Sequence, residues 1–63
     1  MKMATLEQIE HDVVWHVQHE TKYHSALKEP YCVDYNGKLF SSSDTRDLVI
    51  QIMRDCHGVN LEN

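Results

Sequence analysis

Residues that break or cross-link a chain are scarce in this sequence of 63 residues, which has two glycines, one proline and two cysteines. Two cysteines are too few for the disulfide framework of a small secreted domain, so we interpret Cys32 and Cys56 as free thiols of a cytoplasmic protein. No apolar run approaches the ~18 residues of a membrane-spanning helix. The first residues lead directly into polar positions without the apolar segment of a signal peptide, so we expect neither a membrane protein nor an exported one.

Positive charge is also limited, because six Lys and Arg stand against ten Asp and Glu and leave a formal net charge of −4. The basic residues are scattered and give no helix a basic face, so we do not expect direct contact with nucleic acid. Hydrophobic residues make up 41% of the chain, which is typical of a folded domain. The length allows a single domain over residues 1–63, which buries only about 60% of the surface of its unfolded chain.

A capping box marks the start of a first helix, because the Thr5 hydroxyl can accept from the Gln8 amide while the Gln8 side chain reaches back to Thr5. No glycine or proline follows until Pro30, which disfavours helical geometry at Glu29. The pattern predicts a helix over about residues 6–28, roughly 34 Å long. Its apolar stripe, interrupted by Glu20 and His24 in the second half, consists of Leu6, Ile9, Val13, Val17 and Leu27.

A β-hairpin over about residues 31–40 is predicted next, because Asn36 and Gly37 supply the two positive φ angles of a type I′ turn. The two-residue loop places Val33 opposite Phe40 and Tyr35 opposite Lys38. We expect Tyr31, Val33 and Phe40 to share the face that packs on the helices.

The third predicted element is a helix over about residues 44–57, with Ser43 or Asp44 as its N-cap and Gly58 after its last turn. Its apolar stripe consists of Leu48, Val49, Ile52, Met53 and Cys56. The expected fold class is therefore mainly α, with a long N-terminal helix, a short hairpin and a C-terminal helix in αββα order.

The length of the first helix predicts association, because about 34 Å exceeds what a globule of this size needs. An overhanging helix leaves an apolar face uncovered, so we expect a helix-mediated homodimer with two-fold symmetry. In the alternative, the helix breaks near Thr21 and folds back, which buries Trp15 within one chain.

The predicted interface for a partner or for self-association centres on Trp15, which lies opposite the apolar stripe of the first helix and is flanked at i−4 and i+4 by His11 and His19. Ile50 lies off the stripe of the second helix, and Tyr35 lies beside the turn. Tryptophan and tyrosine are frequent interface anchors. Histidines near such an interface are expected to make association sensitive to pH between about 5 and 7.

Catalytic and metal chemistry is not expected, although five histidines are many for this length. The chain has no CxxC, HxxxH or HExxH pattern, so we predict neither a metal nor a cofactor. A site made of Cys32, Cys56 and His57 would need the hairpin and the helix end to meet. Cys56 and His57 are neighbours that point about 100° apart on a helix, and so short a chain has little room for a pocket of ~300 Å³, so we expect no enzyme.

The whole chain resembles the small early accessory proteins of lambda-like temperate bacteriophages, which are encoded between the exonuclease and excisionase genes. The resemblance is carried by residues 12–19 (DVVWHVQH), residues 31–37 (YCVDYNG), the chain length and its general character. It implies a helical accessory protein made early in infection, in the host cytoplasm, that acts on host physiology or on the lysis–lysogeny choice through protein contacts. It assigns no functional residue.

The function expected from the sequence is therefore that of a non-enzymatic interaction or regulatory protein that binds an as yet unidentified protein. Two alternatives remain open. The chain could be a small dimeric transcription-type regulator that contacts nucleic acid, or a zinc-stabilised mini-domain.

Overall fold

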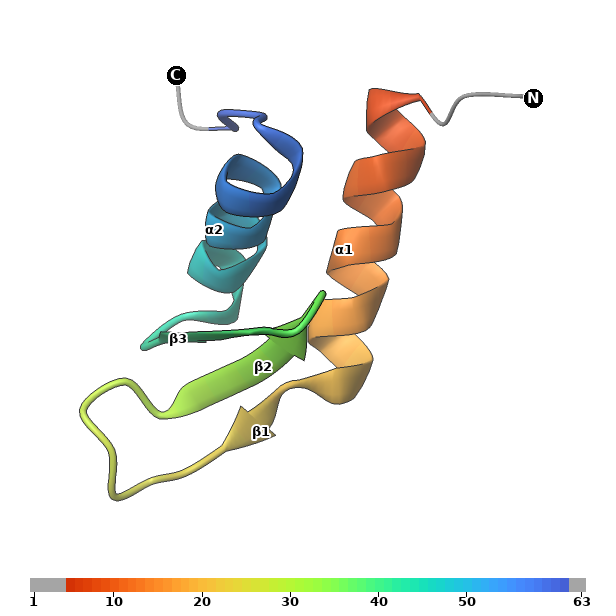
Figure 1. Ribbon diagram of the computed structural model, residues 1–63. Helices are drawn as coiled ribbons and strands as arrows, with labels where there is room; N and C mark the ends of the chain where they lie inside the picture. The colour runs from red at the N-terminus through yellow and green to blue at the C-terminus, as the bar shows by residue number, and fades with distance from the viewer. Residues whose placement is uncertain (1–4, 62–63) are drawn as a thin grey trace.

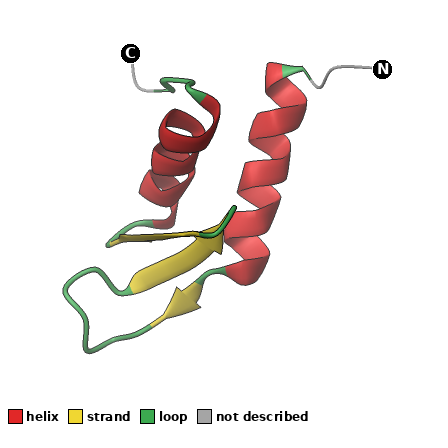
Figure 2. Cartoon of the chain, in the orientation of Figure 1, coloured by secondary structure: helices red, strands yellow, loops and turns green. Residues whose placement is uncertain are grey.

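Two helices pack on one face of a three-stranded antiparallel sheet in the computed structural model, which describes residues 5–61 (Figure 1). Both helices lie on the same side of the sheet, and none of the helices and strands of residues 5–61 covers the other side (Figure 2). The start of the first helix and the end of the second lie at the same end of the molecule, away from the sheet. In chain order the elements are α1 (Leu6–Glu20), β1 (Lys22–Tyr23), β2 (Tyr31–Tyr35), β3 (Lys38–Ser42) and α2 (Thr45–His57).

The predicted first helix is wrong in its second half, because α1 ends at Glu20. Thr21 is extended, and residues 22–23 form a short strand that pairs with the start of β2. The helix ends at Glu20 because its apolar stripe stops at Val17. In a longer helix, the side chains of Glu20 and His24 would point towards the core. The fold is therefore not mainly α, and the helix is only about 22 Å long at 1.5 Å per residue.

The local signals at the start of α1 and in the hairpin are confirmed. The Thr5 amide donates to Gln8 Oε1 at 3.0 Å, and the Gln8 amide donates to Thr5 Oγ1 at 3.2 Å. Asn36 and Gly37 have φ values of 52° and 76°, as a type I′ turn requires. The predicted register is also correct, since the strand pairs include Val33 with Phe40 and Tyr35 with Lys38.

Both caps of the second helix are confirmed. Asp44 is the N-cap, and its side chain accepts from the Arg46 amide at 3.0 Å. Gly58 closes the helix with a φ of 66°, a left-handed conformation that glycine adopts without steric cost. The Val59 amide then donates to the Met53 carbonyl at 3.0 Å, and Val59 packs against the core.

The core lies between the two helices and the inner face of the hairpin. The hairpin packs on the helices of its own chain, as Val33 and Phe40 are both buried against them. Half-buried Tyr31 packs on the same cluster, as expected for this face of β2. Within the described residues the buried apolar side chains are Val13, Val17, Val33, Phe40, Leu48, Val49, Ile52 and Met53.

A row of polar contacts joins α2 to β3. Ser42, which is only 4% exposed, donates its hydroxyl to Asp47 Oδ2 at 2.8 Å. Gln51 Nε2 donates to the same carboxylate at 2.9 Å and to the Ser41 carbonyl at 3.1 Å. These hydrogen bonds, from Ser42 first and Gln51 second, lower the pKa of Asp47 from its ordinary value.

Replacing Asp47 with alanine should lower the free energy of unfolding at pH 7 by about 1–3 kcal/mol, because the buried Ser42 hydroxyl loses its acceptor. Since folding lowers the pKa of Asp47, its carboxylate stabilises the fold above the ordinary pKa and loses that effect as the pH falls through the folded-state value. The difference between wild type and Asp47→Ala should therefore shrink below about pH 4. Urea unfolding followed by far-UV circular dichroism at pH 7 and pH 3 measures both.

The matched control is Asp55→Ala, which removes an exposed ion pair of 3.4 Å with Lys38. Exposed pairs contribute little, so this variant should lose less than about 1 kcal/mol. Equal losses for the two variants at pH 7 would contradict the role assigned to Asp47.

Candidate functional site

The candidate sites are surfaces where large apolar side chains face solvent. Within residues 5–61, Trp15 lies on the outer face of α1, and Leu27 and Leu39 lie on the face of the sheet that no helix covers. Leu6 belongs to the apolar stripe of α1, and Tyr23 lies beside Tyr31. The exposed fractions are 52% for Leu6, 53% for Trp15, 60% for Tyr23, 52% for Leu27 and 65% for Leu39.

Trp15 forms the centre of the outer face of α1, on the opposite side of the helix from Val13 and Val17. Its indole stacks on the His19 ring, with ring centroids 4.2 Å apart and planes 16° from parallel. His19 Nδ1 lies 2.8 Å from the Trp15 carbonyl oxygen. Because a carbonyl only accepts, Nδ1 is the donor, and this bond fixes the imidazole against the helix. The two rings therefore form a rigid, exposed aromatic platform.

The surroundings of this platform are acidic. The helix Leu6–Glu20 contains four carboxylates and neither Lys nor Arg. One of the four, Glu10, pairs with Arg46 of α2 at 3.8 Å, which leaves the other three without a basic partner among the described residues. Of these three, Glu7 and Asp12 lie on the Trp15 side of the helix, whereas Glu20 lies at its end and lines the open face of the sheet.

Three of the five predicted interface residues share this face, since His11 and His19 lie one turn on either side of Trp15 and all three are exposed. Ile50 lies on α2 and is half-buried. Tyr35 is turned inward, packs against the core and shares a hydrogen bond of 2.8 Å with His57 Nε2. The structure therefore keeps Tyr35 apart from the surface around Trp15.

Tyr35 belongs to a small polar and aromatic cluster between the helices and the hairpin turn. The His16 ring meets the Tyr35 ring edge-on at 5.2 Å, and His16 Nε2 donates to the Asp34 carbonyl at 2.6 Å. Burial raises the pKa of Tyr35, and the nearby Cys56 and Asp12 raise it further. Sequence analysis missed this cluster, because its hydrogen bonds join residues 18 and 22 positions apart.

Tyr35→Phe should lower the free energy of unfolding at pH 7 by about 1 kcal/mol, because it removes the hydrogen bond to His57 and keeps the ring. Since folding raises the pKa of Tyr35, the neutral phenol stabilises the fold below the ordinary pKa of about 10 and loses that effect as the pH rises through the folded-state value. The difference between wild type and Tyr35→Phe should therefore narrow above pH ~10. Urea unfolding at neutral and alkaline pH measures it.

Tyr23→Phe is the control, since the Tyr23 hydroxyl makes no hydrogen bond within the described residues. It should leave the stability unchanged at both pH values. A loss as large as that of Tyr35→Phe would refute the assignment.

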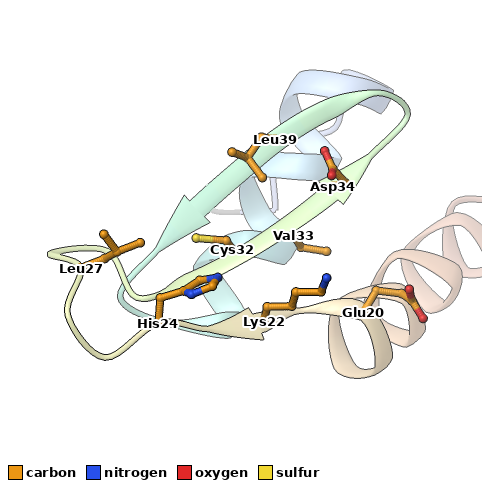
Figure 3. Close-up of a pocket in the computed structure, with 8 residues that line it drawn as sticks. All are labelled: Glu20, Lys22, His24, Leu27, Cys32, Val33, Asp34 and Leu39. Carbon is orange, nitrogen blue, oxygen red and sulfur yellow. The ribbon is translucent and has the colours of Figure 1, made fainter.

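The open face of the sheet is the second candidate surface, formed by residues that alternate with those in the core (Figure 3). Leu39, Cys32 and Leu27 surround a shallow pocket of about 380 Å³. The sequence predicts little room for a concave pocket of ~300 Å³, and this hollow is of comparable volume but open to solvent. The polar residues that line it are Glu20, Lys22, His24 and Asp34.

Sequence analysis overlooked this face, although its signal was present. Leu27 was assigned to the apolar stripe of the first helix, and with that helix ending at Glu20 it lies instead in the loop before β2. Cys32, Asp34 and Leu39 are the hairpin residues left over once Val33 and Phe40 are placed in the core, so alternation along the strands could have identified them.

In the described part of the chain, the candidate metal ligands and the two cysteine thiols do not come together in one site. No group of three or more His, Cys, Asp or Glu side chains there could hold a metal ion. Cys56 packs against the core, whereas Cys32 lies on the open face, so the set of Cys32, Cys56 and His57 is not brought together. The Cys32 thiol donates to the Glu29 carbonyl at 3.9 Å and not to His24.

The basic residues of the described part of the chain form no extended surface, because three of them pair with acids. Lys38 and Arg54 both contact Asp55, and Arg46 contacts Glu10. In addition, no helix within residues 5–61 has the length and apolar character needed to cross a bilayer.

Comparison with known proteins gives no match: no family model, no curated protein and no solved structure is similar to this chain at a significant level.

Removing the imidazole that holds the indole should loosen Trp15 without unfolding the chain. Trp15 is the single tryptophan, so its near-UV circular dichroism and fluorescence anisotropy report on it alone. His19→Ala should reduce both signals and leave far-UV circular dichroism unchanged, because the stacked partner is lost from an exposed helix surface. His11→Ala, one turn away and outside the stack, is the control and should change neither signal. Unchanged near-UV circular dichroism in His19→Ala would show that stacking does not fix the indole.

Proposed function

We propose that this protein is a non-enzymatic binding protein of the cytoplasm, that it contacts a partner protein through the outer face of α1, and that it works as a homodimer. The observation that carries the proposal is Trp15, which is more than half exposed although it is the largest side chain of the protein. The stack on His19 holds it in one orientation.

A rigid exposed indole is suited to protein recognition. Tryptophan is enriched among the residues that contribute most to binding, where it fills a pocket of the partner. A side chain already fixed by its neighbours loses little conformational freedom on binding, so more of the contact energy appears as affinity. The hydrogen bond between His19 and the Trp15 carbonyl supplies that fixation.

The charge around Trp15 defines the chemistry of the partner. Glu7 and Asp12, which have no basic partner among the described residues, lie on the Trp15 side of the helix, and the helix contains no Lys or Arg. A complementary partner therefore offers an apolar slot for the indole with Lys or Arg around it. Phosphate backbones are repelled by the same carboxylates, which disfavours direct nucleic-acid binding as the function.

The resemblance to small early proteins of lambda-like bacteriophages supplies a biological setting for this proposal. In that setting the protein acts in the host cytoplasm and changes host physiology or the lysis–lysogeny choice by occupying a host or phage protein. An acidic platform with one aromatic anchor is consistent with such an accessory role.

Capture experiments with immobilised protein test the proposed surface. Wild-type protein should retain a defined protein from a bacterial lysate, and Trp15→Ala should retain at least about tenfold less of it, as expected for a binding hot spot. Tyr23→Ala removes an exposed aromatic side chain that lies beside Tyr31, outside both candidate surfaces, and is the matched control, which should bind like the wild type. With the purified partner, Trp15 emission should shift to shorter wavelength as the indole leaves water.

Equal capture by wild type and Trp15→Ala would refute the assignment of this face. Association with duplex DNA at low salt that weakens steeply as salt is added would favour the alternative of a nucleic-acid-binding regulator.

A further inference from the structure

The proposed function includes a homodimer, and the inference that follows rests on that part of it. Two surfaces could join the copies: the outer face of α1 and the open face of the sheet. A contact between two α1 helices through the Trp15 face would bring Glu7 and Asp12 of one copy close to Glu7 and Asp12 of the other, with no Lys or Arg in either helix. Like charges across an interface are unfavourable, so the outer face of α1 is a poor surface for self-association.

The open face of the sheet has a different charge pattern. Strand pairing places Lys22 and Cys32 in one row across the sheet, and Asp34 and Leu39 in the next row towards the turn. Both signs of charge are therefore present on one surface. Leu39 and Asp34 lie side by side near the hairpin turn, Lys22 and Glu20 lie on β1 and at the end of α1, and Leu27 lies in the loop that follows β1 (Figure 3).

Lys22 and Asp34 on this face form no ion pair within residues 5–61. The ion pairs of the described residues join Lys38, Arg46 and Arg54 to acids. The most exposed of the large apolar side chains, Leu39, stands on the same face. An ammonium, a carboxylate and an apolar group are thus all available for a partner.

We propose that the open face packs on the open face of a second copy, around a two-fold axis that lies between the sheets and runs perpendicular to the strands. This axis places each strand over the same strand of the second copy, and the two strands run in opposite directions. The row of Lys22 and Cys32 in one copy therefore lies over the row of Asp34 and Leu39 in the other. Lys22 of each copy then meets the row that holds Asp34 of the other, next to Glu20. Leu39 lies over Ser41 of the other copy, next to Cys32. The charges are therefore complementary across the axis.

The size of the face sets the expected strength of the dimer. Three strands about 4.8 Å apart and five residues rising about 3.3 Å each cover roughly 14 by 17 Å. Even with the loop around Leu27, this contact is smaller than the roughly 800 Å² per partner of a standard stable interface. The dimer is therefore weak, and it forms in the high micromolar range.

Sedimentation equilibrium between about 10 µM and about 1 mM tests the proposal, since weak dimers populate over that range. The molar mass of the wild type should rise towards that of two chains. Leu39→Asp should raise the dissociation constant at least about tenfold, because it places a charge at an apolar position of the contact. Trp15→Ala, on the other surface, should dimerise like the wild type. Far-UV circular dichroism checks that each variant is folded.

A charge exchange tests the predicted pairing directly. Lys22→Glu alone and Asp34→Lys alone should each weaken self-association, because each brings like charges together across the axis. An equimolar mixture of the two variants should dimerise more strongly than either alone, since the two altered side chains then meet each other. In a Cys56→Ser background, a short bismaleimide should link two copies through Cys32, and Leu39→Asp should abolish the link.

The possible results of these experiments distinguish a failure of the sheet-mediated dimer from a failure of the proposed role of Trp15. A wild type that stays monomeric up to about 1 mM would overturn the sheet contact and the homodimer together, while the capture experiment would still decide the role of Trp15. A dimer that persists in Leu39→Asp and disappears in Trp15→Ala would overturn the sheet contact alone. A mixture of charge variants that associates no better than its components would refute the two-fold arrangement.

Discussion

The structure depends on the end of the apolar stripe at Val17. Val13 and Val17 are the only buried residues of α1 among those described, and the next inward position is taken by Glu20. A carboxylate is costly to place in an apolar core without a partner, so the chain leaves the helix there. The residues after Thr21 then pair with the start of β2. Both helices are consequently short enough to lie on one face of a small sheet, and the other face stays open.

The sequence predicts what depends on neighbours along the chain. The capping box, the turn at Asn36 and Gly37, the hairpin register and the caps of α2 all involve residues within a few positions of one another, and all are confirmed. The outward orientation of Trp15 followed from helical periodicity in the same way. The end of α1 did not, because β1 has only two residues and exists only through pairing with Tyr31 and Cys32. A two-residue strand that exists only through pairing with residues further along the chain gives no alternating pattern in its own sequence.

The histidines show that contacts between distant residues also limit how well the candidate sites can be predicted from the sequence. Their number suggested metal ligands as one alternative, yet three of the five have other roles in the described structure. His19 supports the indole, His16 donates to the carbonyl of Asp34, and His57 shares a hydrogen bond with the Tyr35 hydroxyl. The partners of His16 and His57 come from β2, so spacing along the helices could not reveal them. The number of histidines therefore indicated that polar side chains were available, but it did not indicate which residues they contact.

The two surfaces differ in the sign of the charges that they carry, and this difference suits them to different partners. The outer face of α1 is of one sign and therefore suits a partner of the opposite sign, whereas the open face carries both signs and suits a copy of itself. Because the helices cover the inner face of the sheet, a dimer made through the open face leaves both copies of Trp15 exposed on its outside (Figure 1). Such a dimer presents two identical platforms at a fixed separation. A partner that is itself oligomeric would then be held by two weak contacts, and the second contact would form at high effective concentration.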